Sequence, residues 1–135
     1  MAEENKIFQV KIITPDRVFY SGEATMIEFN TTEGEIGVYK HHIPTTTVLA
    51  PGIVTITNEE DVLRAAVHAG FAEILGDQVT LLAEIAEWPD EIDEKRAEAA
   101  KERAEERIAV KNAATDLIRA EYALRKALVR IEIKQ

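Results

Sequence analysis

Helix-breaking residues are confined to the first two thirds of this 135-residue chain. All six glycines lie before residue 77, and the last of the four prolines is Pro89. Glycine and proline interrupt helices and favour turns. Residues 1–87 therefore suit short strands, whereas the later residues, which include ten alanines after Pro89, can form uninterrupted helices. We predict two domains, residues 1–87 and 88–135, with the boundary near Trp88 and Pro89.

The first domain is predicted to be a β-sandwich or flattened barrel. Its β-branched runs recur about every ten residues between turn residues, which is typical of such folds. In residues 7–12, Phe8, Val10 and Ile12 alternate with polar side chains, as a half-buried antiparallel strand requires. The predicted strands are residues 7–13, 25–30, 36–39, 45–49, 53–57, 62–68, 71–75 and 79–83, and the predicted turns are residues 14–16, 21–23, 33–34, 58–61 and 75–77.

The second domain is predicted to be an antiparallel two-helix hairpin, which makes the fold class α+β. Asp93 suits the N-cap of the first helix, and the chain is expected to reverse direction at residues 110–114. Apolar residues at helical spacing mark the expected buried stripes. These are Ala97, Ala100, Ala104 and Ile108 in the first helix, and Leu117, Ala120, Leu124, Leu128 and Ile131 in the second, with Tyr122 and Val129 to the side.

The alanine-rich stripe predicts a weakly held hairpin. Alanine lets two helices approach closely, but it buries roughly half or less of the apolar area that leucine buries. A helix pair of this size builds no core of its own, so it must pack on the sandwich or on a partner, and it can exchange one for the other. The alternative is a hairpin that stays docked permanently.

Composition excludes several classes of function. The formal net charge is −9, and it arises entirely in residues 1–89, because residues 90–135 hold equal numbers of acidic and basic side chains. Nucleic acid and anionic membrane surfaces repel such a chain. The absence of cysteine excludes disulfides, thiolate catalysis and zinc–thiolate sites. Neither a membrane span nor a secretory signal is predicted, so we expect the chain to stay in the compartment where it is made.

Five short motifs follow one another along the chain. They are residues 14–16 (TPD), 34–44 (GEIGVYKHHIP), 69–74 (AGFAEI), 77–83 (DQVTLLA) and 92–97 (IDEKRA). Each motif is weak alone, but their order before an alanine-rich hairpin is specific. Along its whole length the chain resembles the epsilon subunits of bacterial F-type ATP synthases.

The resemblance implies a β-sandwich followed by a helix-turn-helix, and a role without catalysis. Family members bind the gamma subunit and the membrane c-ring, rotate with them in the central stalk, and use the hairpin to restrain ATP hydrolysis by the alpha/beta hexamer. The chain is therefore expected to be a noncatalytic regulatory part of a rotary motor for proton transport and ATP synthesis. Its expected location is peripheral, at the cytoplasmic face of the bacterial cell membrane.

The motif at residues 92–97 implies a regulatory ATP site in the folded hairpin. Guanidinium groups match phosphate oxygens, and carboxylates accept hydrogen bonds from ribose or adenine. Lys126 departs from the family pattern, which has arginine there, and Arg125 faces about 100° away around the helix. The alternative for Asp93 and Arg96 is an exposed helical ion pair. By resemblance, the ATP-binding residues are Glu87, Ile92, Asp93, Arg96, Ala97, Arg103, Lys126 and Arg130.

The resemblance also implies a contact with the c-ring through Glu35 and His42. A small acidic patch at the end of a sandwich would steer toward basic and polar ring loops. The alternative is a solvated turn. His41 and His42 invite a metal site, but adjacent strand residues point to opposite faces, so no bound metal is expected.

The second helix is basic in an otherwise acidic chain. By resemblance, its cations meet an acidic segment of the beta subunit when the hairpin extends, which would give a salt-sensitive brake on hydrolysis. The alternative is a solvated helix face. The residues concerned are Arg119, Arg125, Lys126 and Arg130.

Two functions of other classes also fit a β-sandwich. A glycosidase would use two carboxylates, but the acidic residues are scattered, and Trp88 is the single tryptophan that could offer an aromatic platform. A stand-alone ligand-binding module would use the helices only as a cap. Activity of the isolated chain would favour the enzyme, and failure to bind any gamma subunit would favour the module.

Overall fold

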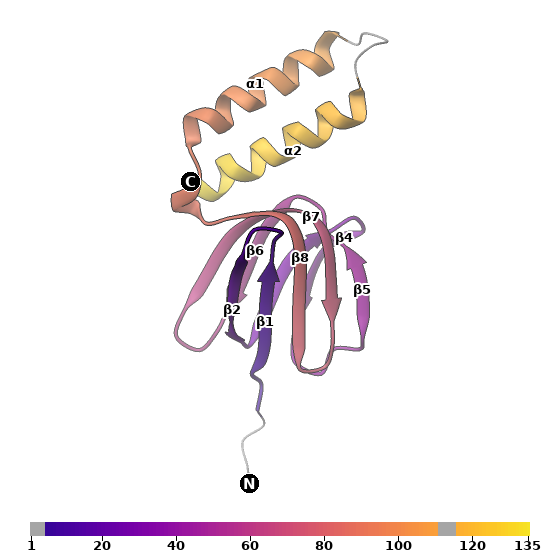
Figure 1. Cartoon of the computed structure of the whole chain (residues 1–135), viewed down its shortest axis with the longest axis vertical. Helices are drawn as coiled ribbons and strands as arrows, with labels where there is room; N and C mark the ends of the chain where they lie inside the picture. Colours follow the sequence, from indigo (N-terminus) through magenta and orange to yellow (C-terminus); the bar gives the residue numbers. More distant parts are fainter. Residues whose placement is uncertain (1–4, 111–115) are drawn as a thin grey trace.

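A β-sandwich carries two antiparallel helices at one end (Figure 1). The computed structural model describes residues 5–110 and 116–135. The elements are β1 (Phe8–Ile13), β2 (Val18–Ala24), β3 (Met26–Thr31), β4 (Gly34–Val38), β5 (Thr45–Val48), β6 (Gly52–Thr57), β7 (Val62–Ile74), β8 (Gln78–Glu87), the 3₁₀ helix η1 (Pro89–Glu91), α1 (Glu94–Val110) and α2 (Leu117–Lys134). The predicted fold class is confirmed.

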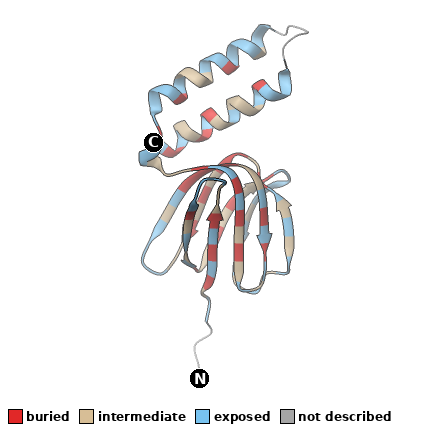
Figure 2. Cartoon of the chain, viewed as in Figure 1, coloured by how far each residue is buried: buried red, intermediate tan, exposed pale blue. Residues whose placement is uncertain are grey.

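The strands form one folded sheet in the order β2-β1-β8-β7-β6-β3-β4, with β5 paired to β7. Neighbouring strands are antiparallel except β1 and β8, which are parallel. Phe8, Val10 and Ile12 of β1 are buried between the layers, whereas Gln9 and Lys11 are exposed, so the predicted alternation is confirmed. Buried residues alternate with exposed ones along several strands of the sandwich (Figure 2), and they form its hydrophobic core.

Strand β7 serves both layers because it bends near its middle. Residues 62–67 pair with β6, and residues 71–74 pair with β5. Ala69 and Gly70 between these segments have positive φ angles of 59° and 117°. The two strands predicted at residues 62–68 and 71–75 are therefore one strand, since Gly70 bends the backbone without ending the pairing.

The prediction of a turn at residues 21–23 is wrong. These residues lie inside β2, where Gly22 pairs with Val10 of β1. A Cβ at Gly22 would meet the ring of Tyr20. The glycine thus accommodates an aromatic side chain and does not form a turn.

The predicted buried face of the second helix is partly wrong. Leu117 and Leu128 are exposed, at 47% and 43%. The helix instead has two buried sides, because it contacts both α1 and the sandwich. Small residues fill the seam with α1, where Ala97 and Ala104 confirm part of the predicted stripe on the first helix, and the buried residues of α2 are Ala120, Ala127, Val129 and Ile133. The predicted reversal lies, beyond Val110, outside the described residues.

We predict that Gly70→Ala destabilises the sandwich by about 2 to 4 kcal/mol. The added Cβ would collide with the Leu82 carbonyl, and the new alanine would have to keep the positive φ of this position. Steric overlap and backbone strain would therefore act together. Urea unfolding followed by Trp88 fluorescence would measure the loss. Gly34→Ala is the matched control, because Gly34 has a φ of +127° and no atom within 4 Å of its added Cβ. An equal loss in both variants would mean that the close approach to β8 contributes nothing.

Candidate functional site

A cleft of about 350 Å³ opens where the end of β8, η1, α1 and α2 meet. Its size falls within the range of small-molecule sites, which is roughly 300 to 1,000 Å³. One wall comes from the sandwich and the opposite walls from the helices. The lining residues are Glu87, Glu91, Ile92, Asp93, Arg96, Ala97, Ala100, Arg103 and Arg130.

Helical spacing aligns the α1 wall of the cleft. Arg96, Ala100 and Arg103 recur at intervals of four and three residues, so they share one face of α1. Ala100 has a small side chain, so it leaves space in the cleft between the long side chains of Arg96 and Arg103. The geometry favours a flat or extended ligand held at guanidinium groups.

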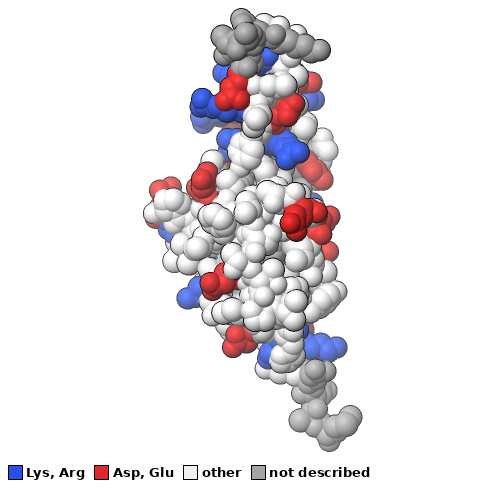
Figure 3. Space-filling model, turned by 90° about the vertical axis from the view of Figure 1, so that its right-hand side faces the viewer, with Lys and Arg blue, Asp and Glu red and all other residues white. Residues whose placement is uncertain are grey.

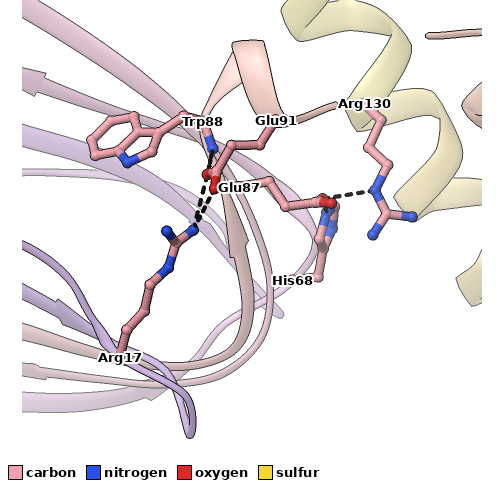
Figure 4. A network of polar contacts seen from close by, with 6 residues as sticks. All are labelled: Arg17, His68, Glu87, Trp88, Glu91 and Arg130. Atoms are coloured by element: carbon pink, nitrogen blue, oxygen red, sulfur yellow. Dashed lines mark hydrogen bonds and ion pairs between the residues drawn. The ribbon is translucent and has the colours of Figure 1, made fainter. Parts of the chain in front are cut away.

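The Glu87 carboxylate joins the sandwich to the hairpin. Its Oε1 accepts a hydrogen bond from Arg130 Nε of α2 at 2.7 Å and lies 3.3 Å from His68 Nε2 of β7 (Figure 4). Burial acts to raise the pKa of Glu87, but hydrogen bonds from His68 and Arg130 outweigh burial, so the pKa lies below its ordinary value. The carboxylate therefore stays charged at neutral pH and holds α2 in place.

A small apolar contact supports this ion pair. Ile92, Val129 and Ile133 pack on Ala66, which lies on the outer face of β7 opposite Glu87. Full burial of an aliphatic side chain contributes about 1.5 to 3 kcal/mol before its entropy cost. Because only a few such side chains hold α2 to the sandwich, the docked hairpin is a weakly stabilised arrangement.

The floor of the cleft is fixed by η1. Glu91 accepts a hydrogen bond from the Trp88 backbone at 2.9 Å and pairs with Arg17 at 2.9 Å. The Arg17 guanidinium and the Trp88 N–H lower the pKa of Glu91. Trp88 stacks on Phe19 with ring centroids 4.3 Å apart, and Lys134 Nζ donates to the Pro89 carbonyl at 3.0 Å. These contacts tie η1 to both the sandwich and α2.

Asp93 is the N-cap of α1, as predicted. Its Oδ1 accepts a hydrogen bond from the Arg96 backbone N–H at 3.1 Å. Across residues 5–110 and 116–135, Arg96 and Arg103 form no ion pair, so the alternative of an Asp93–Arg96 ion pair is not what the geometry shows. Each carboxylate that lines the cleft thus already accepts a hydrogen bond. The guanidinium groups of Arg96 and Arg103 form no ion pair within the described residues, so they are suited to bind an anion.

Seven of the eight residues predicted to bind ATP line this cleft. Lys126, the eighth, lies over the Tyr122 ring at 5.2 Å from its centroid and does not line the cleft. Glu91, Ala100 and the supporting His68 were not among the residues expected at the site. A polar side chain within the apolar run 65–68 was the available signal for His68.

The structure does not bring Glu35 and His42 together. Glu35 lies near the start of β4 and borders a second cleft of about 490 Å³, which Arg125 and Leu128 of α2 also line. His42 follows the other end of β4, where its Nδ1 lies 2.7 Å from the Ile43 carbonyl. A contact that used both residues would have to extend along the strand.

The cations of α2 are in different environments. Arg119 and Arg125 are exposed, Arg130 is engaged by Glu87, and Lys126 is partly covered. Acidic and basic side chains mix over the helices, whereas the sandwich face in the same view has a broad area without charge (Figure 3). In the described parts of the chain, no group of three or more His, Asp or Glu residues could hold a metal ion. None of the described helices is long and apolar enough to cross a membrane.

Family models match the chain in two consecutive segments. Residues 7–89 match the model described as ATP synthase, Delta/Epsilon chain, beta-sandwich domain. Residues 90–135 match the ATP synthase, Delta/Epsilon chain, long alpha-helix domain.

Curated relatives are similar along nearly their whole length. An ATP synthase epsilon chain of Caldanaerobacter subterraneus subsp. tengcongensis is 45% identical over 130 residues, covering 96% of this chain and 94% of the relative. One from Ruminiclostridium cellulolyticum is 41% identical over 124 residues, covering 92% of each.

Two solved structures share the fold. A chain of the Euglena gracilis mitochondrial ATP synthase (OSCP/F1/c-ring, rotational state 1) matches with a TM-score of 0.83 and 25% identity, over 97% of this chain and 82% of that one. A chain of the Tetrahymena thermophila mitochondrial ATP synthase central stalk and c-ring matches with a TM-score of 0.62 and 13% identity, over 99% and 100%. At 13% identity, the second likeness supports the fold alone.

Proposed function

The chain belongs to the ATP synthase delta/epsilon chain family, as an epsilon subunit of the central stalk, and from this premise we propose that it senses ATP through its cleft and restrains ATP hydrolysis through its hairpin. It has no catalytic role of its own in this proposal. The free energy of ATP binding would decide between two positions of the hairpin, docked on the sandwich or extended toward the catalytic hexamer.

One observation carries the ATP proposal. The cleft gathers seven residues that the family resemblance assigns to nucleotide, and it leaves Arg96 and Arg103 without an ion pair in the described parts of the chain. Guanidinium groups suit the negative oxygens of a triphosphate. An ionised carboxylate has about four acceptor positions, so Glu87, Glu91 and Asp93 could accept from ribose hydroxyls or the adenine amino group beside their present hydrogen bonds.

The cleft exists only in the docked arrangement, since Glu87 comes from the sandwich while Arg96, Arg103 and Arg130 come from the helices. A ligand that binds only the docked form stabilises it by RT ln(1 + [L]/Kd), about 1.4 kcal/mol at nine times Kd. A ligand that bound both forms equally would shift nothing. High ATP would therefore hold the hairpin away from the hexamer.

We predict that replacing both Arg96 and Arg103 by alanine weakens ATP binding by at least about 100-fold. Each lost charge-assisted hydrogen bond costs roughly 1.5 to 3 kcal/mol. Calorimetric titration with ATP would measure the affinity, and small-angle scattering would report the compaction that binding brings. Arg107→Ala is the matched control, because Arg107 lies one turn beyond Arg103 on α1 and does not line the cleft. Equal affinity of wild type and double variant would exclude the cleft as the ATP site.

The same double variant should keep the brake applied in the assembled enzyme. At ATP concentrations that release inhibition of the wild type, hydrolysis by the variant enzyme is expected to remain inhibited, because ATP no longer favours the docked hairpin. The measurement is the rate of hydrolysis against ATP concentration, with the Arg107→Ala enzyme following the wild-type curve. If the variant enzyme were released at the same ATP concentration, another site would control the hairpin.

The exposed cations of α2 are suited to hold the extended hairpin. Arg119 and Arg125 are exposed in the docked form, and Arg130 becomes free once it leaves Glu87. We assign these residues and Lys126 to an acidic surface of the beta subunit. Contacts between exposed charges are screened by salt, so inhibition should weaken as ionic strength rises.

An apolar strip on the outer face of the sandwich is suited to the gamma subunit. Val48, Phe71 and Leu82 are directly opposite one another on β5, β7 and β8, with exposed fractions of 44%, 55% and 50%. Ile13 of β1 extends the row beyond Leu82. Contiguous exposed apolar side chains of this kind mark surfaces that partner proteins cover.

We predict that Phe71→Glu weakens binding to the isolated gamma subunit by about 10-fold or more, because a charge would be buried at the interface. Surface plasmon resonance would measure the affinity, and thermal unfolding would check that the fold is unchanged. Val62→Glu is the control, since Val62 is an exposed apolar residue of the same strand outside the strip. If both variants bound gamma like wild type, the strip would not be the gamma-binding surface.

The proposal places the chain in the rotor. The gamma subunit would hold the apolar strip, and the c-ring would meet the sandwich through Glu35 and His42, both accessible to solvent at least in part. Attachment through these partners would keep the chain peripheral, at the cytoplasmic face of the bacterial membrane. Cross-linking from a cysteine at position 42 to the ring would test this contact.

A further inference from the structure

His68 is a fully buried, titratable side chain that does not line the cleft. It lies on β7, where both faces of the strand are covered. Ala65 and Val67 point into the sandwich core, whereas Ala66 packs against α2 on the opposite face. By strand alternation His68 shares that outer face, so the helix hairpin is what covers the imidazole.

The hydrogen bonding of His68 favours a neutral ring. An ionised Glu87 can only accept, so Nε2 of His68 carries the proton that points to Oε1 at 3.3 Å. Within the described residues, Nδ1 is buried and has no hydrogen-bond partner. Protonation would turn Nδ1 into a buried N–H donor without an acceptor, which is a costly arrangement.

The charges around the ring act in both directions, because Glu87 favours the protonated imidazole whereas Arg130 and Lys126 oppose it. Glu87 faces it from β8, and Arg130 and Lys126 face it from α2. The carboxylate already serves Arg130 at 2.7 Å (Figure 4). An imidazolium would therefore add a third positive charge around a single negative one.

We propose that His68 is a proton-sensitive positioning residue: its neutral imidazole holds Glu87 in place for Arg130, and its protonation releases α2 from the sandwich. The inference rests on the two-position hairpin of the proposed function, but it does not depend on ATP as the ligand. Undocking of α2 would also separate the walls of the cleft, so acidification would lower the affinity for any ligand bound there.

The sign and window of the effect follow from linkage. Burial lowers the pKa of His68 in the docked form, Arg130 and Lys126 lower it further, and Glu87 opposes them. With the docked pKa below the ordinary value of about 6.5, docking is strongest above that pH and is lost as pH falls toward the lower docked pKa. One coupled proton changes the docking constant by at most about 10-fold per pH unit. The pKa of Glu87 is lowered too, so the carboxylate stays ionised while the imidazole titrates.

Docking can be measured directly because the chain has no cysteine of its own. Cysteines introduced at the exposed positions Glu73 of β7 and Glu121 of α2 would carry a donor and acceptor dye pair. Without nucleotide, the docked fraction of the otherwise wild-type chain is expected to fall several-fold between pH 7.5 and 5.5. His68→Gln places an amide nitrogen near the Nε2 position but does not titrate, so its docked fraction should stay flat.

Controls separate this switch from general acid sensitivity. His41→Asn, in an exposed turn where asparagine tolerates the φ of 68°, should keep the wild-type pH dependence. Equal pH dependence in wild type and His68→Gln would overturn the proposal. Should His68→Gln fail to fold, imidazole NMR of the wild type decides, because His68 must titrate below 6.5 together with undocking.

A repeat with ATP distinguishes failure of this inference from failure of the proposed function. A pH-dependent dock that ATP does not strengthen would support the His68 switch and reject ATP as the ligand. If ATP raised the docked fraction, but wild type and His68→Gln had the same pH dependence, ATP would be supported as the ligand and the His68 switch would be rejected.

Discussion

The position of the hairpin depends on one shared carboxylate. Glu87 ends the last strand, accepts from Arg130 of α2 and lies against the buried His68 of β7. Around it the helices contribute only a few aliphatic side chains to the contact with the sandwich. A partly buried charge is stable when it is paired, and costly when one partner leaves. The sandwich core contains none of these residues, so the proposed separation of the hairpin would leave the core packing intact.

Much of the fold follows from residue pattern, because burial acts on it directly. Alternation in β1 predicted the strand, and the absence of glycine and proline after Pro89 predicted the helices. The cleft residues on α1 were expected only from the family resemblance. The pattern failed where one residue type serves two purposes. Gly22 accommodates the Tyr20 ring inside a strand, and α2 buries two narrow sides, so a single leucine stripe was the wrong expectation. His68 was not predicted because its partner Glu87 lies diagonally across from it on β8, and a polar residue in an apolar run indicates burial but not the partner.

Arg130 would have different partners in the two hairpin positions. Arg130 holds Glu87 in the docked form and lines the cleft, and in the proposed extended form it would face the catalytic subunits. Because the Arg130 guanidinium cannot contact Glu87 and the catalytic subunits at once, the docked and extended positions of the hairpin exclude each other. Mutual exclusion of this kind makes a two-state element, and any ligand or proton that distinguishes the states can bias it. ATP and acid would act on the same equilibrium in opposite directions.

The anchoring of η1 determines how the hairpin would travel. Trp88 is stacked on Phe19 and Glu91 is paired with Arg17, and neither contact involves α1 or α2. If the hairpin undocked, it would therefore rotate about Ile92 and Asp93, while η1 stayed attached to the sandwich. A short attachment keeps the local concentration of the docking surface on the order of millimolar or above. The hairpin would redock by a search within its own small volume, so its return would be a unimolecular event independent of the number of enzyme molecules present.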